Sequence, residues 1–512
     1  MDYIKKYKIA DNKIYLTAIV SRFVVLYVLF FNYQLLEGQY LFLEDNLYSY
    51  LDYLHVSQQY SPKYYHDQPY DLSDYKSSSE LLSLLHDRGF SSIPSLNSNG
   101  LDLHFNGGIG VTNRNKLDHT LNMHSVIRYK EDNYIFVNKT GMNRSYLFDV
   151  YYPGELSESE HWIYGMVENA YFKYSNSKIN IFLGRVFRNW GPITEKSLIL
   201  SNNPYPYDHL YLSFENSLFK ISTFATRLNK EDSAFTYHFI DSTITSFQNV
   251  QRFLAGHRID FRIGNKLQIS FTEMAIFGGV NKNFDYSFLV PTNLYYDLQR
   301  NTNKSMSGLW AIDIQYRVKS KTLISAQLLI DDIIINNDPG INDRAKYPDR
   351  MGLICTIKNA DRIFDGLFMS INYIKVWNYT YHSRDSWENY HYKGLRLGYP
   401  FSSSEEIKLK IGYWGFKKMW MTYLLGVGRF GSIDVRDVFT LKKESFPISP
   451  ISSSLHQKLI VQYNLSSKFT ITAKIETFSD LNSPYATRFT NSGLLNCTIE
   501  IKTILSKEFW SS

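Results

Sequence analysis

The chain has 512 residues, of which 16% are aromatic and 44% hydrophobic, yet its mean hydropathy is only −0.29. A polytopic helical membrane protein is excluded because it would need several apolar runs of about 20 residues, and disorder is excluded because this composition can bury a core. The net charge of +6 comes from scattered basic residues, so no nucleic-acid partner is expected. A large soluble β-rich protein or a membrane β-barrel remains, since alternating strands hide their apolarity from averaged hydropathy.

Residues 1–37 have the pattern of an export signal. Basic residues such as Lys5 and Arg22 precede the apolar run Phe23–Phe31, and a basic region before about 7 to 15 apolar residues is typical of a secretory signal. The alternative is an uncleaved anchor helix, for which the run is too short unless residues 18–20 are added across Arg22.

Residues 38–99 are predicted to form a small helical segment. Leu47, Leu51 and Leu54 recur at helical spacing. Ser77 and Glu80 have the spacing of a capping box, and the leucine-rich helix that follows is predicted to end at Gly89.

From residue 100 to the end the hydrophobic period is two, which predicts a barrel domain over residues 100–512. About eighteen strands are predicted, among them His391–Gly398. Their connections alternate between short and long, as in an up-and-down antiparallel outer-membrane barrel with short periplasmic turns and long external loops. The short connections include 175–178, 216–217, 264–265, 319–320 and 399–405, and the long ones include 143–162, 187–208, 228–249, 278–308, 332–350 and 416–454.

Side-chain alternation separates a lipid face from a lumen face. Trp310, Ile312 and Ile314 share one face of their strand, whereas Asp313 and Gln315 share the other. We expect the lumen charges to form a packed, salt-bridged interior rather than a binding site. The only two cysteines, at positions 355 and 497, lie in apolar strands and are predicted to be buried free thiols, with a disulfide as the alternative and a metal site excluded.

One segment is more specific than the periodicity. Leu183-Gly-Arg-Val-Phe-Arg-Asn-Trp-Gly-Pro192 continues through Leu198–Ser201 to Asn203-Pro-Tyr-Pro206. This segment resembles the capsule-assembly Wzi family, whose pattern has Gly-Arg, then Trp-Gly-Pro, then a Leu/Ser-rich rise. Further matches are Glu168, His257-Arg258-Ile259 and Glu273. The chain departs from the family at Ile193, where the family has glycine.

The resemblance implies an 18-stranded outer-membrane barrel of the bacterial cell, with the small helical segment 38–99 on the periplasmic side. It also implies that the external loops largely close the pore and that the barrel anchors capsular polysaccharide like a lectin. Because related proteins serve other surface glycans, the polysaccharide itself is left open. The residues themselves suggest that Glu168 lies opposite Arg185 across a hairpin and forms a charge pair. With Trp190 at the base of the loop, this pair is expected to fix a loop in the barrel mouth rather than to touch a ligand. Such a placement of Arg185 requires a bulge or a covered inner wall, because Ile181 and Leu183 share its face.

Three functions are compared. The first is a non-enzymatic glycan-binding barrel, and the second is an open diffusion or nutrient channel. The third is a hydrolase using His257 or His382, which no motif supports. Aromatic residues of the predicted long loops near the outer rim either contact sugar rings or form the interfacial girdle; they are Trp387, Tyr390, Trp420 and Tyr423. The candidate glycan-binding or loop-fixing residues are Glu168, Arg185, Arg188, Trp190, His257, Glu273, Trp387 and Tyr390. No cofactor or metal is expected, and the expected partners of this monomer are a surface polysaccharide and outer-membrane lipid.

Overall fold

In this computed structural model of the chain, residues 37–512 form one compact unit. The described residues are 39–42, 45–75, 78–90, 99–114, 116–154, 164–192, 196–238, 243–302, 304–332, 349–438, 444–466, 468–479 and 495–508. The signal-like segment 1–37 and the predicted cap residue Ser77 lie outside them.

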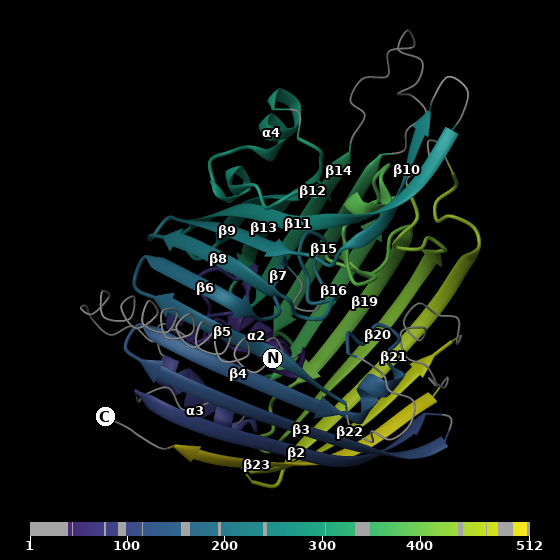
Figure 1. Ribbon diagram of the computed structural model, residues 1–512. Helices are drawn as coiled ribbons and strands as arrows, with labels where there is room; N and C mark the ends of the chain where they lie inside the picture. The colour runs from purple at the N-terminus through teal and green to yellow at the C-terminus, as the bar shows by residue number, and fades with distance from the viewer. Residues whose placement is uncertain are drawn as a thin grey trace, which may run out of the picture. The chain divides into compact units, whose positions relative to one another are not determined.

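One antiparallel sheet curls into a closed ring (Figure 1). The ring closes where the first strand, β2, pairs with the last, β23, from Asp102 opposite Glu508 to Asn113 opposite Cys497. The strands are β2 (Gly100–Arg114), β3 (Lys116–Glu131), β4 (Tyr134–Asn143), β5 (Gly165–Ser175), β6 (Ile179–Arg185), β8 (Asp208–Glu215), β9 (Phe219–Arg227), β10 (Glu231–His238), β11 (Thr243–Ile263), β12 (Leu267–Val280), β13 (Met306–Lys319), β14 (Thr322–Asp332), β15 (Arg350–Ala360), β16 (Leu367–Val376), β19 (Ser404–Tyr413), β20 (Met419–Gly431), β21 (Ile451–Asn464), β22 (Phe469–Phe478) and β23 (Leu495–Glu508).

The predicted number of eighteen strands is confirmed. The sheet contains 19 strands, but β9 and β10 are two parts of one ring position. Both pair with the long strand β11, since Arg227 lies opposite Phe253 and Glu231 lies opposite Val250. Leaving out β10 as the continuation of β9 gives eighteen positions around the barrel.

One predicted wall strand is wrong and another was missed. Residues His391–Gly398 lie inside a loop, where β17 (His391–Tyr392) and β18 (Leu395–Arg396) form a small separate hairpin. The wall strand is instead β20, which the sequence analysis placed in a long loop. Its inward side is apolar or small, with Trp420, Gly426 and Gly428, so β20 lacks the polar alternation that reveals the other strands.

Most connections separate by length between the two ends of the barrel, as predicted. Eight short turns lie at one end, which we call the short-turn end: 132–133, 176–178, 216–218, 264–266, 320–321, 361–366, 414–418 and 465–468. At the opposite, long-loop end the strand pairs β2–β3 and β10–β11 are joined by short connections, and the other connections are long: 144–164, 186–207, 281–305, 333–349, 377–403, 432–450 and 479–494. Three expectations are corrected. The predicted long connection 416–454 contains β20 and part of a short turn, and the predicted long connection 228–249 contains β10 and the start of β11. Of the predicted short connection 399–405, residues 399–403 belong to a long loop and residues 404–405 to β19. In an outer-membrane barrel the short turns face the periplasm and the long loops face the exterior.

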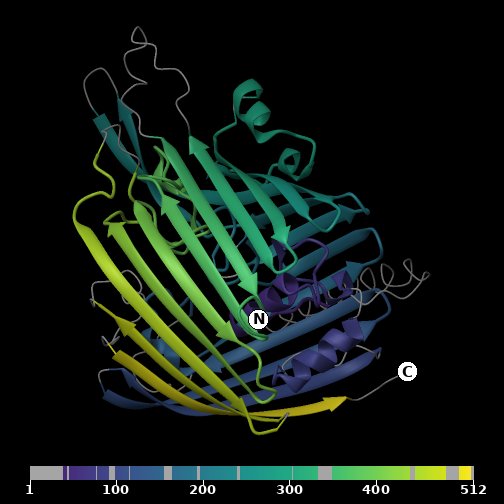
Figure 2. The same ribbon diagram turned by 180° about the vertical axis from the view of Figure 1, so that it is seen from behind.

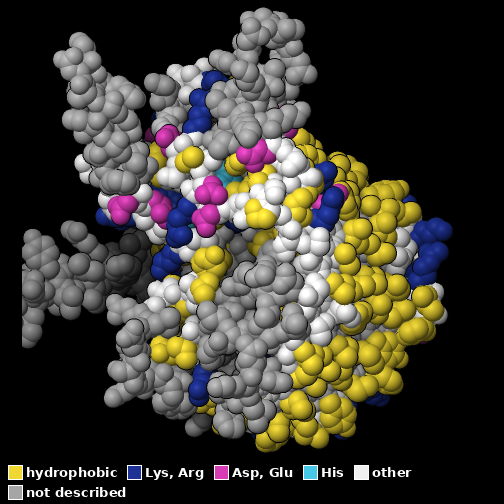
Figure 3. All heavy atoms as spheres, turned by 90° about the vertical axis from the view of Figure 1, so that its right-hand side faces the viewer, with side chains coloured by type: hydrophobic (Ala, Val, Ile, Leu, Met, Phe, Trp, Pro, Cys, Tyr) yellow, Lys and Arg dark blue, Asp and Glu magenta, His cyan; other side chains and the backbone are white. Residues whose placement is uncertain are grey.

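The outer face of the ring, which we call the wall, is apolar, and the inner face is polar. Trp310, Ile314 and Tyr316 of β13 are 44%, 43% and 48% exposed on the wall, whereas Asp313 between them is fully buried inside. Figure 3 shows a broad hydrophobic surface on the right-hand side of that view. This pattern confirms a transmembrane barrel of the outer-membrane type.

Both cysteines are free, as predicted. Their predicted burial is wrong for Cys355, which is exposed on the wall, and Cys497 is half-buried. Both positions follow from period-two alternation, because each cysteine occupies an outward position of its strand.

The described part of the N-terminal segment, residues 39–90, fills the lumen at the short-turn end and is called the plug here (Figure 2). It contains α2 (Asp45–Val56), β1 (Asp67–Gln68), η1 (Leu72–Asp74) and α3 (Ser78–Asp87). The predicted leucine stripe of α2 is confirmed, because Leu47, Leu51 and Leu54 are buried against inward residues such as Trp414 and Trp420. None of the helices in these described residues is long and apolar enough to cross a membrane.

Short elements in the loops complete the fold. They are η2 (Arg144–Phe148), β7 (Asn189–Trp190), η3 (Tyr286–Leu289), α4 (Tyr295–Asn301) and η5 (Ser386–Glu388). Gly89 follows α3 with φ +80°, a left-handed conformation that glycine adopts without strain. The predicted end of this helix at Gly89 is therefore confirmed.

Candidate functional site: the closed mouth of the barrel

Three carboxylates of the plug pair with lysines on the inner face of three different strands. The pairs are Asp52 with Lys358 of β15 at 2.9 Å, Asp67 with Lys220 of β9 at 2.7 Å, and Asp71 with Lys173 of β5. All six side chains are less than a tenth exposed. Because removing one partner of a buried pair leaves an uncompensated charge, these contacts hold the plug in place from several sides of the ring.

Trp190 is fully buried and holds the plug rather than facing a ligand. Its indole Nε1 donates to Asp67 Oδ1 at 2.8 Å, and β7 pairs with β1 of the plug. Asp67 Oδ2 also accepts a hydrogen bond from the Tyr211 hydroxyl at 2.8 Å. Burial alone would raise the pKa of Asp67, but the charges of Lys220 and Arg188 lower the pKa to about 2. Asp67 is therefore ionised at neutral pH and is the centre of the contact between the segment 183–206 and the plug.

Arg188 is buried in the same region of the lumen. Its Nε donates to His209 Nε2 at 2.8 Å, and its guanidinium lies 3.8 Å from the ring centre of Tyr211 and 4.9 Å from that of Phe182. Cation–π contacts of this kind stabilise a desolvated guanidinium. Arg188 thus fixes the segment that leads into β7.

The middle of the lumen contains a buried ionic cluster. Arg258 donates to Asp260 at 2.9 Å and to Asp313 at 2.6 Å, and all three side chains are fully buried. The Arg258 guanidinium also lies 5.8 Å from the Trp190 ring. The predicted packed, salt-bridged interior is confirmed for this part of the barrel.

The connection 377–403 folds inward and closes the long-loop end of the lumen, which we call the mouth. Arg252 of β11 donates from Nε to the carbonyl of Trp387 at 2.6 Å and from Nη2 to that of Asn389 at 2.7 Å. The Tyr390 hydroxyl donates to the Ile199 carbonyl at 2.7 Å, and the Tyr381 hydroxyl donates to the Leu198 carbonyl at 2.8 Å. The loop is therefore hydrogen-bonded both to the wall strand β11 and to the Leu/Ser-rich residues 198–201.

Trp387 and Tyr390 are only 4% and 1% exposed. Their predicted place near the outer rim is corrected: both lie within the closed mouth, and they fix the loop. Trp420 and Tyr423 are also corrected, because they belong to β20, where buried Trp420 packs on Trp414 near the short-turn end.

The predicted pairing of Glu168 with Arg185 is wrong. Arg185 lies opposite Ala170, because the hairpin closes with Ser175 opposite Asn180, two residues away from the register assumed. Glu168 is itself the extra residue of a bulge in β5, since Lys139 pairs with Asn169 and Thr140 pairs with Val167.

Each of the two residues has other partners. Glu168 lies 3.2 Å from Lys139 Nζ and 3.5 Å from His124 Nδ1, and it accepts a hydrogen bond from the Tyr146 hydroxyl at 3.0 Å. Arg185 forms a partly exposed pair with Asp208 at 2.8 Å. Glu168 therefore fixes the start of the 144–164 connection, whereas Arg185 lies on the outer side of β6, as strict alternation requires without a bulge.

His257 and Glu273 lie on the outer face of the barrel and fix a loop there. They are 3.0 Å apart, and Glu273 accepts hydrogen bonds from the backbone amide of Tyr295 at 2.9 Å and from Trp310 Nε1 at 2.7 Å. The connection 281–305 folds over this face and forms a small apolar core with it. Figure 1 shows α4 of this connection beside the rim of the barrel.

Half-buried tyrosines that were not among the predicted site residues lie near the mouth. They are Tyr146, Tyr151 and Tyr152 of the connection 144–164, Tyr205 of the connection 186–207 and Tyr392 of the connection 377–403. The rings of Tyr146 and Tyr152 stack at 5.2 Å, and the Tyr392 ring lies 5.1 Å from that of Tyr207. The sequence feature that could have indicated them is the clustering of tyrosines in predicted long loops, as the Tyr-Tyr pair at 151–152 and the Pro-Tyr-Pro-Tyr run at 204–207.

Charged groups adjoin these tyrosines. The Tyr205 hydroxyl donates to Asp149, and the Lys393 ammonium lies 5.7 Å from the Tyr392 ring centre. A side chain at Gly394 would approach both Tyr151 and Arg436, so the loops touch one another here. Aromatic faces next to hydrogen-bonding groups form the kind of surface that binds sugar rings, and we call Tyr151, Tyr152, Tyr205 and Tyr392 the tyrosine surface.

Comparison with known proteins agrees with this architecture. Residues 115–347 match the family model described as capsule assembly protein Wzi. Among solved structures, Wzi of Escherichia coli, an outer-membrane protein described as a carbohydrate-binding β-barrel involved in group 1 capsule assembly, has a TM-score of 0.59 at 12% identity, covering 92% of this chain and 99% of that one. No curated protein matches the sequence.

Two further barrels are less similar. OccK8 (OprE) of Pseudomonas aeruginosa has a TM-score of 0.44 at 9% identity, covering 80% of this chain and 98% of its own. OccAB2 of Acinetobacter baumannii has a TM-score of 0.42 at 8% identity, with the same two coverages. The resemblance recognised in residues 183–206 is confirmed by the family comparison: residues 115–347 match the model of capsule assembly protein Wzi, and the chain forms an 18-stranded barrel with the fold of Wzi.

Proposed function

We propose that this protein is a non-enzymatic outer-membrane barrel that binds a capsular or related surface polysaccharide at its mouth and holds it on the cell. One observation carries the proposal: the lumen is occupied from both ends, by the plug and by the connection 377–403, while tyrosines from three loops remain half-exposed at the mouth. A barrel filled in this way offers its outer surface, rather than its interior, to a large ligand. Because β2 and β23 close the ring within one chain, a monomer suffices.

The tyrosine surface suits a polysaccharide. The apolar C–H faces of sugar rings pack on aromatic faces, and tyrosine adds a polar tip that bonds to hydroxyl groups. Asp149, Lys393 and Arg436 adjoin the rings and supply acceptors and donors for hydroxyl or acidic groups of the chain. The similarity to Wzi of Escherichia coli, described as carbohydrate-binding, supports the same ligand class.

A diffusion channel is the alternative, and it requires an open lumen. Planar-bilayer recordings of the purified protein separate the two functions. We expect no steady current, because Arg252 ties the loop backbone to the wall at the mouth and three ion pairs hold the plug at the other end. A large steady ohmic current would contradict the proposal.

Catalysis at His257 or His382 has no support in the geometry. His257 is paired with Glu273 under a loop. His382 Nε2 lies 3.4 Å from the Ser402 hydroxyl, but both are buried and Arg396 Nη2 approaches both. An arginine next to the imidazole disfavours the protonated state that a general base must reach, so we infer binding without chemistry.

The decisive experiment measures polysaccharide retention by cells. Deleting the gene should release the polysaccharide into the medium, and the wild-type gene should restore retention. Tyr205→Ala combined with Tyr392→Ala should restore it poorly, whereas Tyr205→Phe, which keeps the ring, should restore most of it. Tyr316→Ala, which removes an exposed tyrosine from the wall, is the matched control and should behave as wild type. Unchanged retention after deletion would overturn the proposal.

A further inference from the structure

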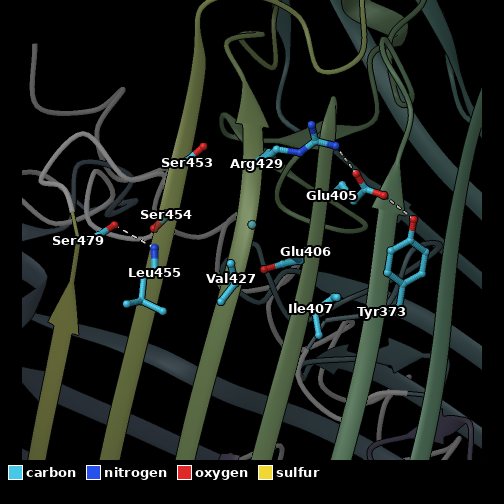
Figure 4. Close-up of a pocket in the computed structure, with 11 residues that line it drawn as sticks. Tyr373, Glu405, Glu406, Ile407, Val427, Arg429, Ser453, Ser454, Leu455 and Ser479 are labelled. Carbon is cyan, nitrogen blue, oxygen red and sulfur yellow. Dashed lines mark hydrogen bonds and ion pairs between the residues drawn. The ribbon is translucent and has the colours of Figure 1, made fainter.

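A groove of about 510 Å³ lies in the upper wall, where β19, β20 and β21 approach the long-loop end (Figure 4). Its lower part is apolar. Ile407, Val427 and Leu455 lie directly opposite one another on the three strands and point outward, with 54%, 54% and 38% exposure. In a membrane barrel this row faces the hydrocarbon of the bilayer.

The upper part of the groove is polar and begins two residues nearer to the loops. Glu405, Arg429 and Ser453 form the next outward row across the same strands. Glu405 accepts hydrogen bonds from Arg429 Nη2 at 2.6 Å and from the Tyr373 hydroxyl at 2.6 Å. Figure 4 shows Arg429, Glu405 and Tyr373 joined in this way along the upper edge. The change from apolar to polar side chains marks the level of the lipid headgroups.

The charge of this row is positive overall. Lys375 of β16 lies opposite Glu405, so two cations flank one carboxylate. The Arg429 side chain is 56% exposed, and only its Nη2 is engaged by Glu405. Glu405 thus orients the guanidinium without neutralising the row, and the remaining N–H groups can meet an anion in the geometry that arginine offers to phosphate.

We propose that this groove binds one anionic phospholipid of the outer leaflet, with an acyl chain against Val427 and a phosphate at Arg429. The volume lies within the range of small-molecule sites, about 300 to 1,000 Å³. The occupant is a membrane lipid rather than the polysaccharide because the lower row is apolar and faces the bilayer. This inference does not depend on the proposed function.

Binding can be measured by native mass spectrometry of the purified barrel in a non-ionic detergent. The probes are phosphatidylglycerol and phosphatidylcholine with identical acyl chains, with inorganic phosphate and the purified surface polysaccharide as competitors. We expect the wild-type barrel to retain one phosphatidylglycerol in preference to phosphatidylcholine, and we expect neither competitor to displace it. Displacement by the polysaccharide, equal binding of the two lipids, or full displacement by free phosphate would overturn the proposal.

Two variants test the two halves of the groove. Arg429→Gln should reduce the preference for phosphatidylglycerol about fivefold, the contribution typical of one basic residue near an anionic lipid surface, and Val427→Trp should block retention by filling the groove. The controls are Arg185→Gln, which removes another outward arginine paired with a carboxylate, and Leu425→Trp, one outward position lower on β20. Heat-modifiable migration on gels verifies that each variant folds. Equal losses in test and control variants would refute the assignment.

Discussion

Replacing Asp67 by asparagine should loosen the plug. Asp67 joins the plug to Trp190, to Tyr211 and to Lys220 at 2.7 to 2.8 Å, and asparagine has nearly the same shape but no charge. The pKa of Asp67 is lowered from 3.8 to about 2, which corresponds to about 2 kcal/mol of stabilisation at neutral pH. The variant also leaves the Lys220 ammonium buried without this partner, so we expect a total loss of about 3 kcal/mol.

Hydrogen–deuterium exchange of the plug measures this loss directly. A decrease of about 3 kcal/mol in the free energy of local opening accelerates exchange about a hundredfold, and the effect should be greatest in peptides that cover α2 and residues 64–75. Glu215→Gln is the matched control, because Glu215 pairs at 2.6 Å with the plug residue Lys63 but both side chains are partly exposed, at 19% and 29%. Such a pair is worth less than about 1 kcal/mol.

The same reasoning sets a pH window. Because the pKa of Asp67 is lower in the folded state, its contribution is complete above about pH 4 and is lost as the pH falls towards 2. Adding Lys220→Met to Asp67→Asn should recover part of the loss, since no buried charge then remains unpaired at this site. If the plug of Asp67→Asn exchanges no faster than that of Glu215→Gln, the buried ion pairs do not hold the plug.

Three further predictions concern the loops and the wall. Burial and the charge of Arg396 lower the pKa of His382 to about 3, so protonation of this imidazole should weaken the closed connection 377–403 as the pH falls from 6.5 towards 3. Hydrogen–deuterium exchange of this connection, corrected for intrinsic rates, should therefore accelerate between pH 7 and 5. The acceleration should be smaller in His382→Gln. Glu168→Gln should destabilise the start of the connection 144–164 by about 2 kcal/mol because Lys139 stays buried, whereas Arg185→Gln should cost less than about 1 kcal/mol in the same exchange measurement. Gly184 has φ +134°, and a Cβ there would lie 2.3 Å from the Ala170 carbonyl oxygen. Gly184→Ala should therefore lower the temperature at which the barrel loses heat-modifiable migration on gels. Gly107→Ala is the control and should not lower it, because a Cβ at Gly107 would meet open space.

Much of the barrel follows from local sequence, because period two and the alternation of short and long connections are properties of neighbouring residues. The errors lie where local information is insufficient. Strand β20 was missed because its inward positions contact the plug, as at Trp420 against Phe90, and an inward face that packs on protein is not polar. The predicted pairing of Glu168 with Arg185 was wrong because the turn between β5 and β6 is tighter than assumed, and a tighter turn shifts every cross-strand partner by two residues.

The sides on which the loops fold could be predicted only in part. His257 and Glu273 share outward parity with Phe253 and Phe277, so alternation alone would have placed them outside the barrel. In contrast, the pair formed by Asp52 and Lys358 joins residues 306 positions apart, and the hydrogen bond from Tyr390 to Ile199 links two loops. Contacts of this kind depend on how the whole ring closes, and no periodicity in the sequence reports them.

The aromatic content of the chain is explained by the filled lumen as much as by the membrane. A ring of eighteen strands encloses a wide interior that must be hydrated or filled. Here the plug brings a buried tyrosine cluster into it, with Tyr48 stacked on Tyr70 at 5.1 Å and Tyr65 stacked on His55 at 4.1 Å. Tyrosine fills space and also bonds to the polar inner face, as at Tyr65 with Asp52 and Lys358. A channel needs water where these rings lie, so we expect the same residues that stabilise the plug to oppose conduction, as the proposed function requires.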